Sequence, residues 1–87
     1  MHESSLIPDL MEKILSVARD NGAQKIATVD LRIGALAAIA PDHLRDHFIE
    51  ASRGCEAEGA ELRIVVDEDL LSPHAHTVLL EAVEIEE

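Results

Sequence analysis

The residues whose types and spacing best suit a specific chemistry are the first three, Met1-His2-Glu3. Because His2 is large, the initiator methionine is expected to stay, so the free amine belongs to Met1. This amine, the His2 backbone nitrogen and the His2 imidazole can close two fused chelate rings around one metal ion. Nitrogen ligands of this kind suit square-planar Ni(II) or Cu(II). Glu3 can add its own backbone nitrogen or orient the imidazole.

The chelate makes one chemical demand, which is that the His2 amide loses its proton. Only a strongly polarising metal in a planar site brings this about. A histidine at the second position is common, however, and usually has no metal role. The residues alone therefore leave two interpretations open, a Ni(II) or Cu(II) site and an ordinary polar terminus.

A second candidate is the pair His43 and His47, four residues apart in a predicted helix. This spacing places both side chains on one face of the helix. A metal ion could bridge them, with Asp42 or Asp46 nearby. The alternative, which we favour from sequence, is that both are solvated polar residues beside an apolar stripe.

His74 and His76 form a third candidate, a secondary metal site. Their rings project to the same side if the stretch is extended, and the acidic residues 67–69 precede them. A hairpin loop with incidental histidines is the alternative interpretation. Cys55 is the only cysteine, so the chain can form neither an internal disulfide nor a cysteine-based zinc site. We expect Cys55 to be a small packed residue.

Charge and composition exclude several classes of partner. Eighteen Asp and Glu against seven Lys and Arg give a net charge of −11, which repels nucleic acids and anionic membranes and attracts cations and basic protein surfaces. The same acidity can simply serve solubility. Phe48 is the only aromatic residue, so base-stacking platforms are excluded. Apolar runs are too short to span a bilayer, and the start resembles no signal peptide. We therefore expect a cytoplasmic protein.

These candidate ligands must be positioned by a small set of helices and strands. Apolar residues recur at helical spacing from Leu6 to Ala18, namely Leu6, Ile7, Leu10, Met11, Ile14, Val17 and Ala18. We expect Ser5 to cap this helix, because Pro8 then stands where no backbone N–H is needed. Met1–Ser4 would be an extended arm. Gly22 should end the helix in a left-handed conformation.

The next segments predict a strand and a second helix. Lys25–Ile33 alternates, with Ala27, Val29, Leu31 and Ile33 on the buried face. Gly34 ends this strand and a small-residue loop follows. Pro41 should open the second helix at its first position, with Leu44, Phe48 and Ala51 on the inner side and Gly54 closing it.

Two further strands complete the prediction. Residues 61–66 alternate, and Val78–Glu86 alternates with a one-residue slip that a bulge near Glu81–Ala82 would reconcile. The predicted fold is α+β, with two helices on one face of a three-stranded sheet in the order α-β-α-β-β.

The sequence resembles the HypA/HybF family of hydrogenase-maturation proteins over nearly its whole length. Four blocks in the right order carry the resemblance: Met1-His2-Glu3 followed by an amphipathic helix, Val29–Leu36 with Pro41–Leu44 after it, Gly54–Leu62, and Val83–Glu86. The resemblance implies a cytoplasmic chaperone that carries Ni(II) through Met1 and His2, with Glu3 as a candidate third ligand. It also implies delivery to hydrogenase precursors or urease together with a partner GTPase.

The resemblance fails at one segment. Family members insert a zinc ribbon with two Cys-x-x-Cys pairs between the second and third strands. Residues 67–77 stand in that place and contain no cysteine, so we expect a short connection without structural zinc. The chain, residues 1–87, is thus interpreted as a single nickel-binding domain. Ala37 and Ala38 also stand where the family usually carries a Ser.

Two functions from different classes remain open at this point. One is a nickel metallochaperone, and the other is an adaptor or scaffold paralogue that binds maturation factors and transfers no metal. An enzyme is not expected, because the sequence shows no nucleophile–base pair, Gly-rich phosphate loop or buried carboxylate pair. Two edge strands in so small a sheet also predict a homodimer, through strand or hairpin exchange around residues 67–77.

Overall fold

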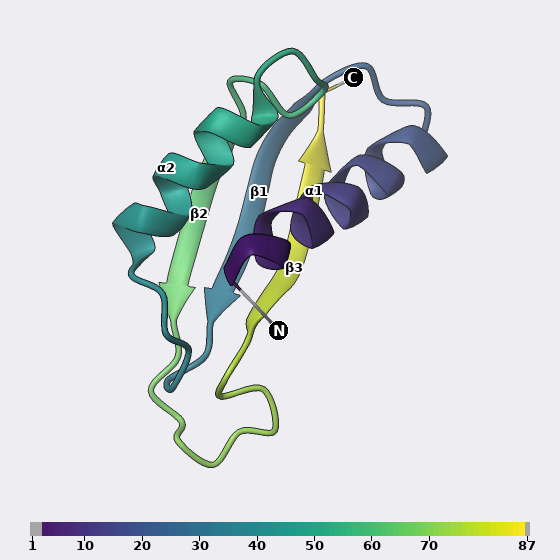
Figure 1. Cartoon of the computed structure of the whole chain (residues 1–87). Coiled ribbons are helices and arrows are strands. Elements are labelled where there is room, and N and C mark those ends of the chain that lie inside the picture. Colours follow the sequence, from purple (N-terminus) through teal and green to yellow (C-terminus); the bar gives the residue numbers. More distant parts are fainter. Residues whose placement is uncertain (1–2, 87) are drawn as a thin grey trace.

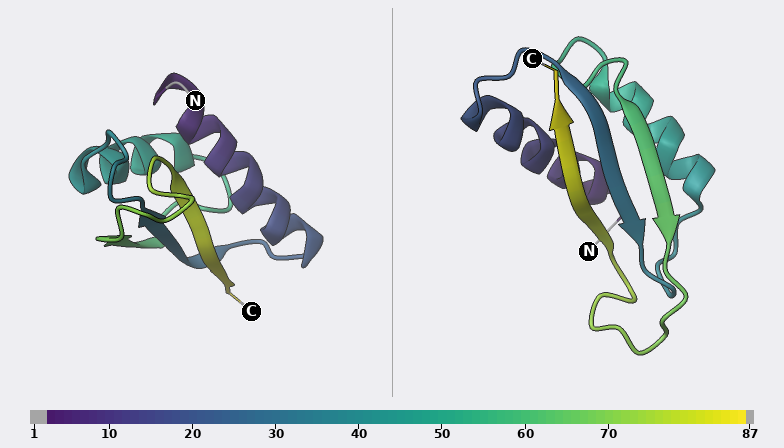
Figure 2. Two further views of the ribbon diagram at one scale, coloured as in Figure 1. Left: turned by 90° about the horizontal axis from the view of Figure 1, so that it is seen from below. Right: turned by 180° about the vertical axis from the view of Figure 1, so that it is seen from behind.

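The computed structural model describes residues 3–86, with side chains from Leu6 onward. The elements follow in the order α1 (Glu3–Asp20), β1 (Ile26–Ile33), α2 (Pro41–Ser52), β2 (Glu61–Val66) and β3 (Val78–Ile85). Both helices lie on one face of the three strands, and the opposite face is open (Figures 1 and 2). The α+β fold and its α-β-α-β-β order are confirmed.

The strands pair in the order β2-β1-β3. β1 is the central strand, parallel to β2 and antiparallel to β3. Parallel strands need a long crossover between them, and α2 supplies it. Residues 67–77 then carry the chain from β2 past the end of β1 to β3 (Figure 1).

The bulge predicted in the last strand is confirmed. Asp30 pairs with Ala82 and the next residue, Leu31, pairs with Leu80, so Glu81 is the extra residue. The bulge restores the inward direction of the apolar side chains on both halves of β3.

A second irregularity was not predicted. Ile26 pairs with Ile85 and Thr28 with Glu84, which leaves Ala27 as an extra residue on β1. Strict alternation had placed Ala27 on the buried face. Instead Ile26 is completely buried and Ala27 only half-buried, because a bulge reverses the side-chain phase.

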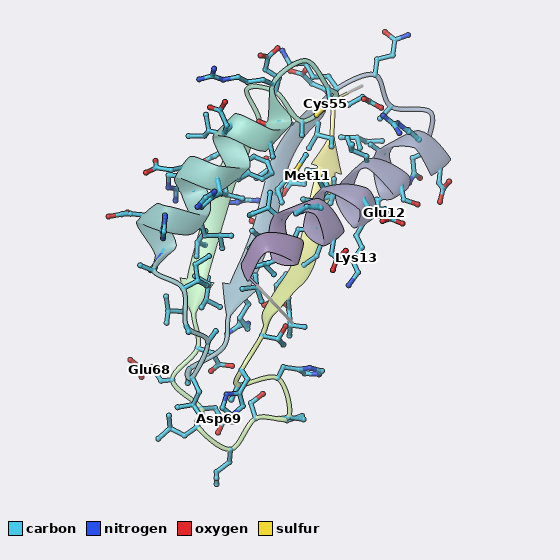
Figure 3. The ribbon with its side chains drawn as sticks, viewed as in Figure 1. Met11, Glu12, Lys13, Cys55, Glu68 and Asp69 are labelled. Atoms are coloured by element: carbon cyan, nitrogen blue, oxygen red, sulfur yellow. The ribbon has the colours of Figure 1, made fainter. Side chains whose placement is uncertain are left out.

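The core lies between the helices and the inner face of the sheet. Met11 points from α1 toward the sheet, whereas Glu12 and Lys13 are exposed on the outer side of the helix (Figure 3). The fully buried large side chains are Ile14, Ile26, Leu31, Ile33, Leu44 and Val29. Two expected positions differ, because Val17 is 39% exposed and Ala51 is exposed, while Ser52 is buried in place of Ala51.

The predicted start of the first helix is wrong. α1 already begins at Glu3 and includes Ser5, so Ser5 is not its cap and Ser4 is not part of an extended arm. Pro8 therefore stands inside the helix, where it cannot donate a hydrogen bond to the carbonyl of Ser4. Pro8 is solvent-exposed, and at an exposed position water can replace a missing partner. The helix therefore tolerates the hydrogen bond that Pro8 cannot make, which the prediction had treated as prohibitive.

The end of α1 is as predicted. Gly22 has a φ of 67°, which a glycine adopts without strain. The Ala23 N–H donates to the Ala18 carbonyl at 2.9 Å, and the Gly22 N–H donates to the Arg19 carbonyl at 3.1 Å. These two bonds satisfy carbonyls that the helix end would leave free.

An ion pair also fixes this end of the helix. Arg19 Nε donates to Glu56 Oε2 at 2.7 Å, which joins α1 to the loop after α2. The hydrogen bond from Arg19, together with a backbone hydrogen bond, lowers the pKa of the Glu56 carboxyl below its ordinary value of 4.5. The pair is partly exposed, so its contribution is modest.

The connection of residues 67–77 is anchored to Gly34 at the end of β1. The Gly34 N–H donates to the Thr77 carbonyl at 2.8 Å, and the Leu36 N–H donates to the Ala75 carbonyl at 2.7 Å. A Cβ on Gly34 would lie 2.3 Å from the Ala75 carbonyl oxygen and 2.4 Å from that of His74. The approach is possible only because Gly34 has no side chain.

We predict that Gly34→Ala destabilises the protein by about 1–3 kcal/mol, because a methyl group at this backbone contact forces an overpacked site apart. Urea unfolding measures the loss, and hydrogen exchange should show faster exchange of the Leu36 amide. Gly59→Ala is the matched control, because Gly59 has open space around it and only its φ of 79° resists a side chain. Unchanged exchange at Leu36 in Gly34→Ala would contradict the close contact.

A second prediction concerns pH and the Arg19–Glu56 pair. Because the folded state lowers the pKa of Glu56, its contribution is present above pH 4.5 and is lost as the pH falls through the folded-state value. Glu56→Gln should therefore lower the urea midpoint at pH 7 and make less difference at pH 3. Glu58→Gln, at a neighbouring exposed carboxylate, is the control. An equal difference at both pH values would show that the ion pair is not responsible.

Candidate metal centre

Of the three predicted ligands, Glu3 falls within the described residues. Met1 and His2 lie outside the described residues, and Glu3 is the first residue of the helix. The first four N–H groups of a helix have no carbonyl partner within it. The backbone nitrogen of Glu3 is therefore not committed to the helix and is available as a ligand.

The helix that follows these residues is held firmly against the rest of the protein. Leu6 and Leu10 are 8% and 5% exposed, and both belong to the hydrophobic cluster that includes Leu44 and Phe48 of α2. Burying a side chain of this size contributes about 1.5–3 kcal/mol. The first turns of α1, from Leu6 onward, are thus part of a fixed scaffold.

His74 and His76 do not have the conformation that the sequence argument assumed. Residues 73–76 form turns rather than an extended segment, with the Thr77 N–H donating to the His74 carbonyl at 3.1 Å. Both histidines are exposed, and Ala75 between them is buried. The expectation that both rings project to the same side required an extended segment and is not met. A secondary metal site at His74 and His76 stays a prediction.

His43 and His47 are brought together. Both are exposed on α2, and their ring centroids are 4.7 Å apart with the ring planes tilted by 44°. Their spacing predicted the shared face, although solvated side chains without a role were the favoured interpretation. In the described part of the chain, no group of three or more His, Cys, Asp or Glu side chains is arranged to hold a metal ion.

Cys55 has the packing role that was expected. It is half-buried, and its thiol donates to the Ser52 carbonyl at 3.1 Å. Figure 3 shows Cys55 in the loop beyond α2, far from the acidic residues Glu68 and Asp69 in the connection between β2 and β3.

The open face of the sheet carries ion pairs that sequence analysis did not identify. Arg63 of β2 donates to Asp30 of β1 at 2.6 Å and to Glu84 of β3 at 2.7 Å, and Arg32 pairs with Glu81. The carboxylates raise the pKa of both guanidinium groups. On this described face the two arginines are already engaged, so they do not form a site for anions. The register of the three strands brings each arginine close to its carboxylate partners. That register cannot be predicted from the local sequence.

One surface hollow of about 480 Å³ opens beside the carboxyl end of α1. It is lined by Asn21, Gly22, Ala23, Gln24, Lys25, Ile85 and Glu86. This lining contains no imidazole or thiol, so it does not suit nickel. Among the described residues, neither helix is long and apolar enough to cross a membrane.

Comparison with known proteins identifies the family. A family model described as hydrogenase/urease nickel incorporation, metallochaperone, hypA matches residues 1–72. The hydrogenase maturation factor HypA of Chlorobaculum tepidum is 42% identical over 64 residues, covering 74% of this chain and 57% of the relative. HypA of Methanopyrus kandleri is 36% identical over 67 residues, covering 77% of this chain and 47% of the relative.

The fold is shared with a solved structure, the solution structure of the Ni metallochaperone HypA from Helicobacter pylori. The two agree with a TM-score of 0.80 at 18% identity, and the comparison covers 98% of this chain and 97% of the other. The chain spans about half the length of the curated relatives that it matches. The family model covers most of the chain, and the chain therefore belongs to the HypA family.

Proposed function

We propose that this protein is a nickel metallochaperone that binds Ni(II) through the Met1 amine, His2 and Glu3 for the maturation of a nickel enzyme of the hydrogenase or urease type. The observation that carries the proposal is the family match, which begins at residue 1 and includes the Met-His-Glu run. Relatives at 36–42% identity are named hydrogenase maturation factors. A cytoplasmic setting is part of the same proposal.

The position of α1 supports this ligand set. A helix N-terminus carries partial positive charge, which disfavours a bare cation beside it. A chelate that contains a deprotonated backbone amide brings its own negative charge and offsets this repulsion. Because Glu3 is the first helical residue, its nitrogen can also bind without breaking a hydrogen bond within the helix.

The arrangement also suits a metal that must be passed on. The ligands come from consecutive residues at one end of a helix, so they need no enclosing cavity. An incoming protein ligand can displace the imidazole while the amine and amide still hold the metal. The net charge of −11 raises the local concentration of cations and favours a basic partner surface. A GTPase partner and the nickel-free enzyme are proposed from the resemblance.

The residues present do not fit a structural zinc. Cys55 is the only cysteine of the chain, and its thiol is occupied by the Ser52 carbonyl. A zinc ribbon needs four thiolate or imidazole ligands, and residues 67–77 supply only His74 and His76. We therefore propose no structural zinc in residues 67–77.

The second candidate function is an adaptor that binds maturation factors without moving metal. The observation in its favour is that residues 67–77 form a connection closely attached to Gly34 and carry no cysteine. The fold and its surfaces would then be kept for protein binding alone. Nickel affinity at the amino terminus separates the two functions.

We predict that untagged protein with a free Met1 amine binds one Ni(II) with the d–d absorption of a planar site, and that acetylating the amine abolishes this band. Acetylation removes the amine ligand and the chelate ring that it closes with the His2 amide, and with them the anchor that lets the metal displace the amide proton. His2→Ala should have the same effect, whereas His74→Ala should leave the band unchanged. A single added residue is a poor control, because it moves the histidine to position three and creates a different, tighter chelate.

The same site should respond to pH. Formation of the chelate displaces protons from the amine and the amide, so binding releases protons and weakens as the pH falls below neutral. Calorimetry in buffers of different ionisation enthalpy counts the released protons. If acetylated protein keeps the planar band at the same affinity, the metal is held elsewhere.

A homodimer is proposed from the sheet edges. β2 and β3 are both edge strands, and edge strands can pair with another chain. On β2, Arg45 of α2 donates to the Leu62 carbonyl at 2.8 Å and so protects part of that edge. We expect β3 to be the pairing edge, and a dimer at high concentration. Sedimentation that finds only monomers at millimolar concentration would contradict this expectation.

A further inference from the structure

We propose that His43 and His47 form a second metal site, in which two imidazoles on the surface of α2 bind a divalent transition-metal ion, Ni(II) in the first place. The two rings lie with centroids 4.7 Å apart and both are exposed. The proposal depends on these two side chains and not on the chelate at residues 1–3.

The helix holds the pair in place. Each histidine directly precedes a buried anchor, Leu44 after His43 and Phe48 after His47, and these anchors are 0% and 3% exposed. The anchors fix the rotation of α2 about its axis. The two imidazoles therefore start on one face, one turn apart, and binding a shared metal costs little further ordering.

The pair lies on the flank of α2 that faces away from β2. Residues along a helix are rotated by roughly 100° each, so both histidines stand almost opposite Arg45. Arg45 reaches the Leu62 carbonyl of β2.

α1 lies on the same side of α2 as the two histidines, opposite Arg45. It contacts both α2 and β3, and β3 is at the other end of the sheet from β2. The amino-terminal part of α1 is the part beside α2, and its carboxyl end points away (Figures 1 and 2). The imidazole pair therefore projects from the side of α2 on which α1 begins.

The donor set determines the chemistry. Imidazole nitrogen suits Ni(II), Cu(II) and Zn(II), and a pair of histidines four residues apart on one helix is a known way to present two of them to one ion. No third His, Cys, Asp or Glu among the described residues completes a cluster with them. Water therefore fills the remaining positions, which makes the site weaker than a chelate and fast to exchange.

The surroundings favour a cation. Asp42 and Asp46 are exposed on the same helix, and the whole chain has a net charge of −11, so the local cation concentration is raised. No backbone amide has to be deprotonated here. Bound Ni(II) should accordingly be six-coordinate and paramagnetic, unlike Ni(II) in a planar four-coordinate chelate.

The test uses the protein of residues 1–87 with an acetylated amino terminus, so that the Met1 amine cannot bind, titrated with Ni(II) alone. We expect saturable binding and paramagnetic broadening of the His43 and His47 imidazole signals in NMR spectra. Loss of partners that merely orient a metal ligand weakens binding about 10–100-fold. Removing a ligand itself, in His43→Ala or His47→Ala, should weaken Ni(II) binding at least about 10-fold. His74→Ala and His76→Ala should leave the affinity unchanged.

A composition-matched variant separates the pairing from the number of histidines. The double change His47→Ile with Ile49→His keeps both histidines on the exposed surface of α2, because Ile49 is 51% exposed, but moves one to a different face. It should bind Ni(II) as weakly as His47→Ala, with unchanged helicity by circular dichroism. The proposal is overturned if acetylated wild type shows no saturable binding, if the double variant binds equally well, or if broadening centres on His74 and His76.

Discussion

The burial of one apolar stripe of α1 against the sheet is the interaction on which the rest of this structure depends. Leu6, Leu10, Met11, Ile14 and Ala18 form that stripe and are all buried. They hold a helix that begins at Glu3, so the residues with metal-binding chemistry directly precede a fixed element. Without this packing the first residues would be a free tail, and any metal they bound would have no defined relation to the rest of the protein.

A second constraint shapes the opposite end of the molecule. Residues 67–77 carry the chain from β2 to β3 and pass close to Gly34, where the Gly34 N–H donates to the Thr77 carbonyl and the Leu36 N–H donates to the Ala75 carbonyl. A small domain buries little apolar surface, so such local backbone contacts matter. They allow a short segment without cysteine to close the fold where the resemblance places a zinc ribbon in the family.

Periodicity made most of the fold predictable from sequence. The apolar stripe of α1, the proline at the start of α2 and the one-residue slip in β3 each have a local cause, and each was interpreted correctly apart from Val17 of the stripe, which is exposed. Ala27 was misplaced because a bulge in β1 depends on pairing with Glu84 and Ile85, which local sequence does not reveal. The early start of α1 was not predicted, because the missing N–H of Pro8 was expected to keep that residue out of the helix interior, whereas Pro8 is exposed and water can replace the missing partner.

The candidate sites were predictable to a different degree. The chelate at Met1, His2 and Glu3 is a matter of consecutive residues, so it can be proposed without a structure. The spacing of His43 and His47 was visible, but their ring contact and their flank of α2 required the packing of Leu44 and Phe48. The shared direction of His74 and His76 was expected from an extended segment. The segment instead forms turns around Ala75, and turns are not visible in the spacing of two histidines.

We propose that the first Ni(II) ion is held by consecutive nitrogen atoms at the amino terminus. X-ray absorption spectroscopy of protein loaded with one equivalent of nickel tests it most directly, because it reports coordination number and the number of imidazoles. We expect a four-coordinate planar site with a single imidazole, that of His2. A six-coordinate site with two imidazoles would contradict it, because the first ion would then be held by a histidine pair and not by the chelate.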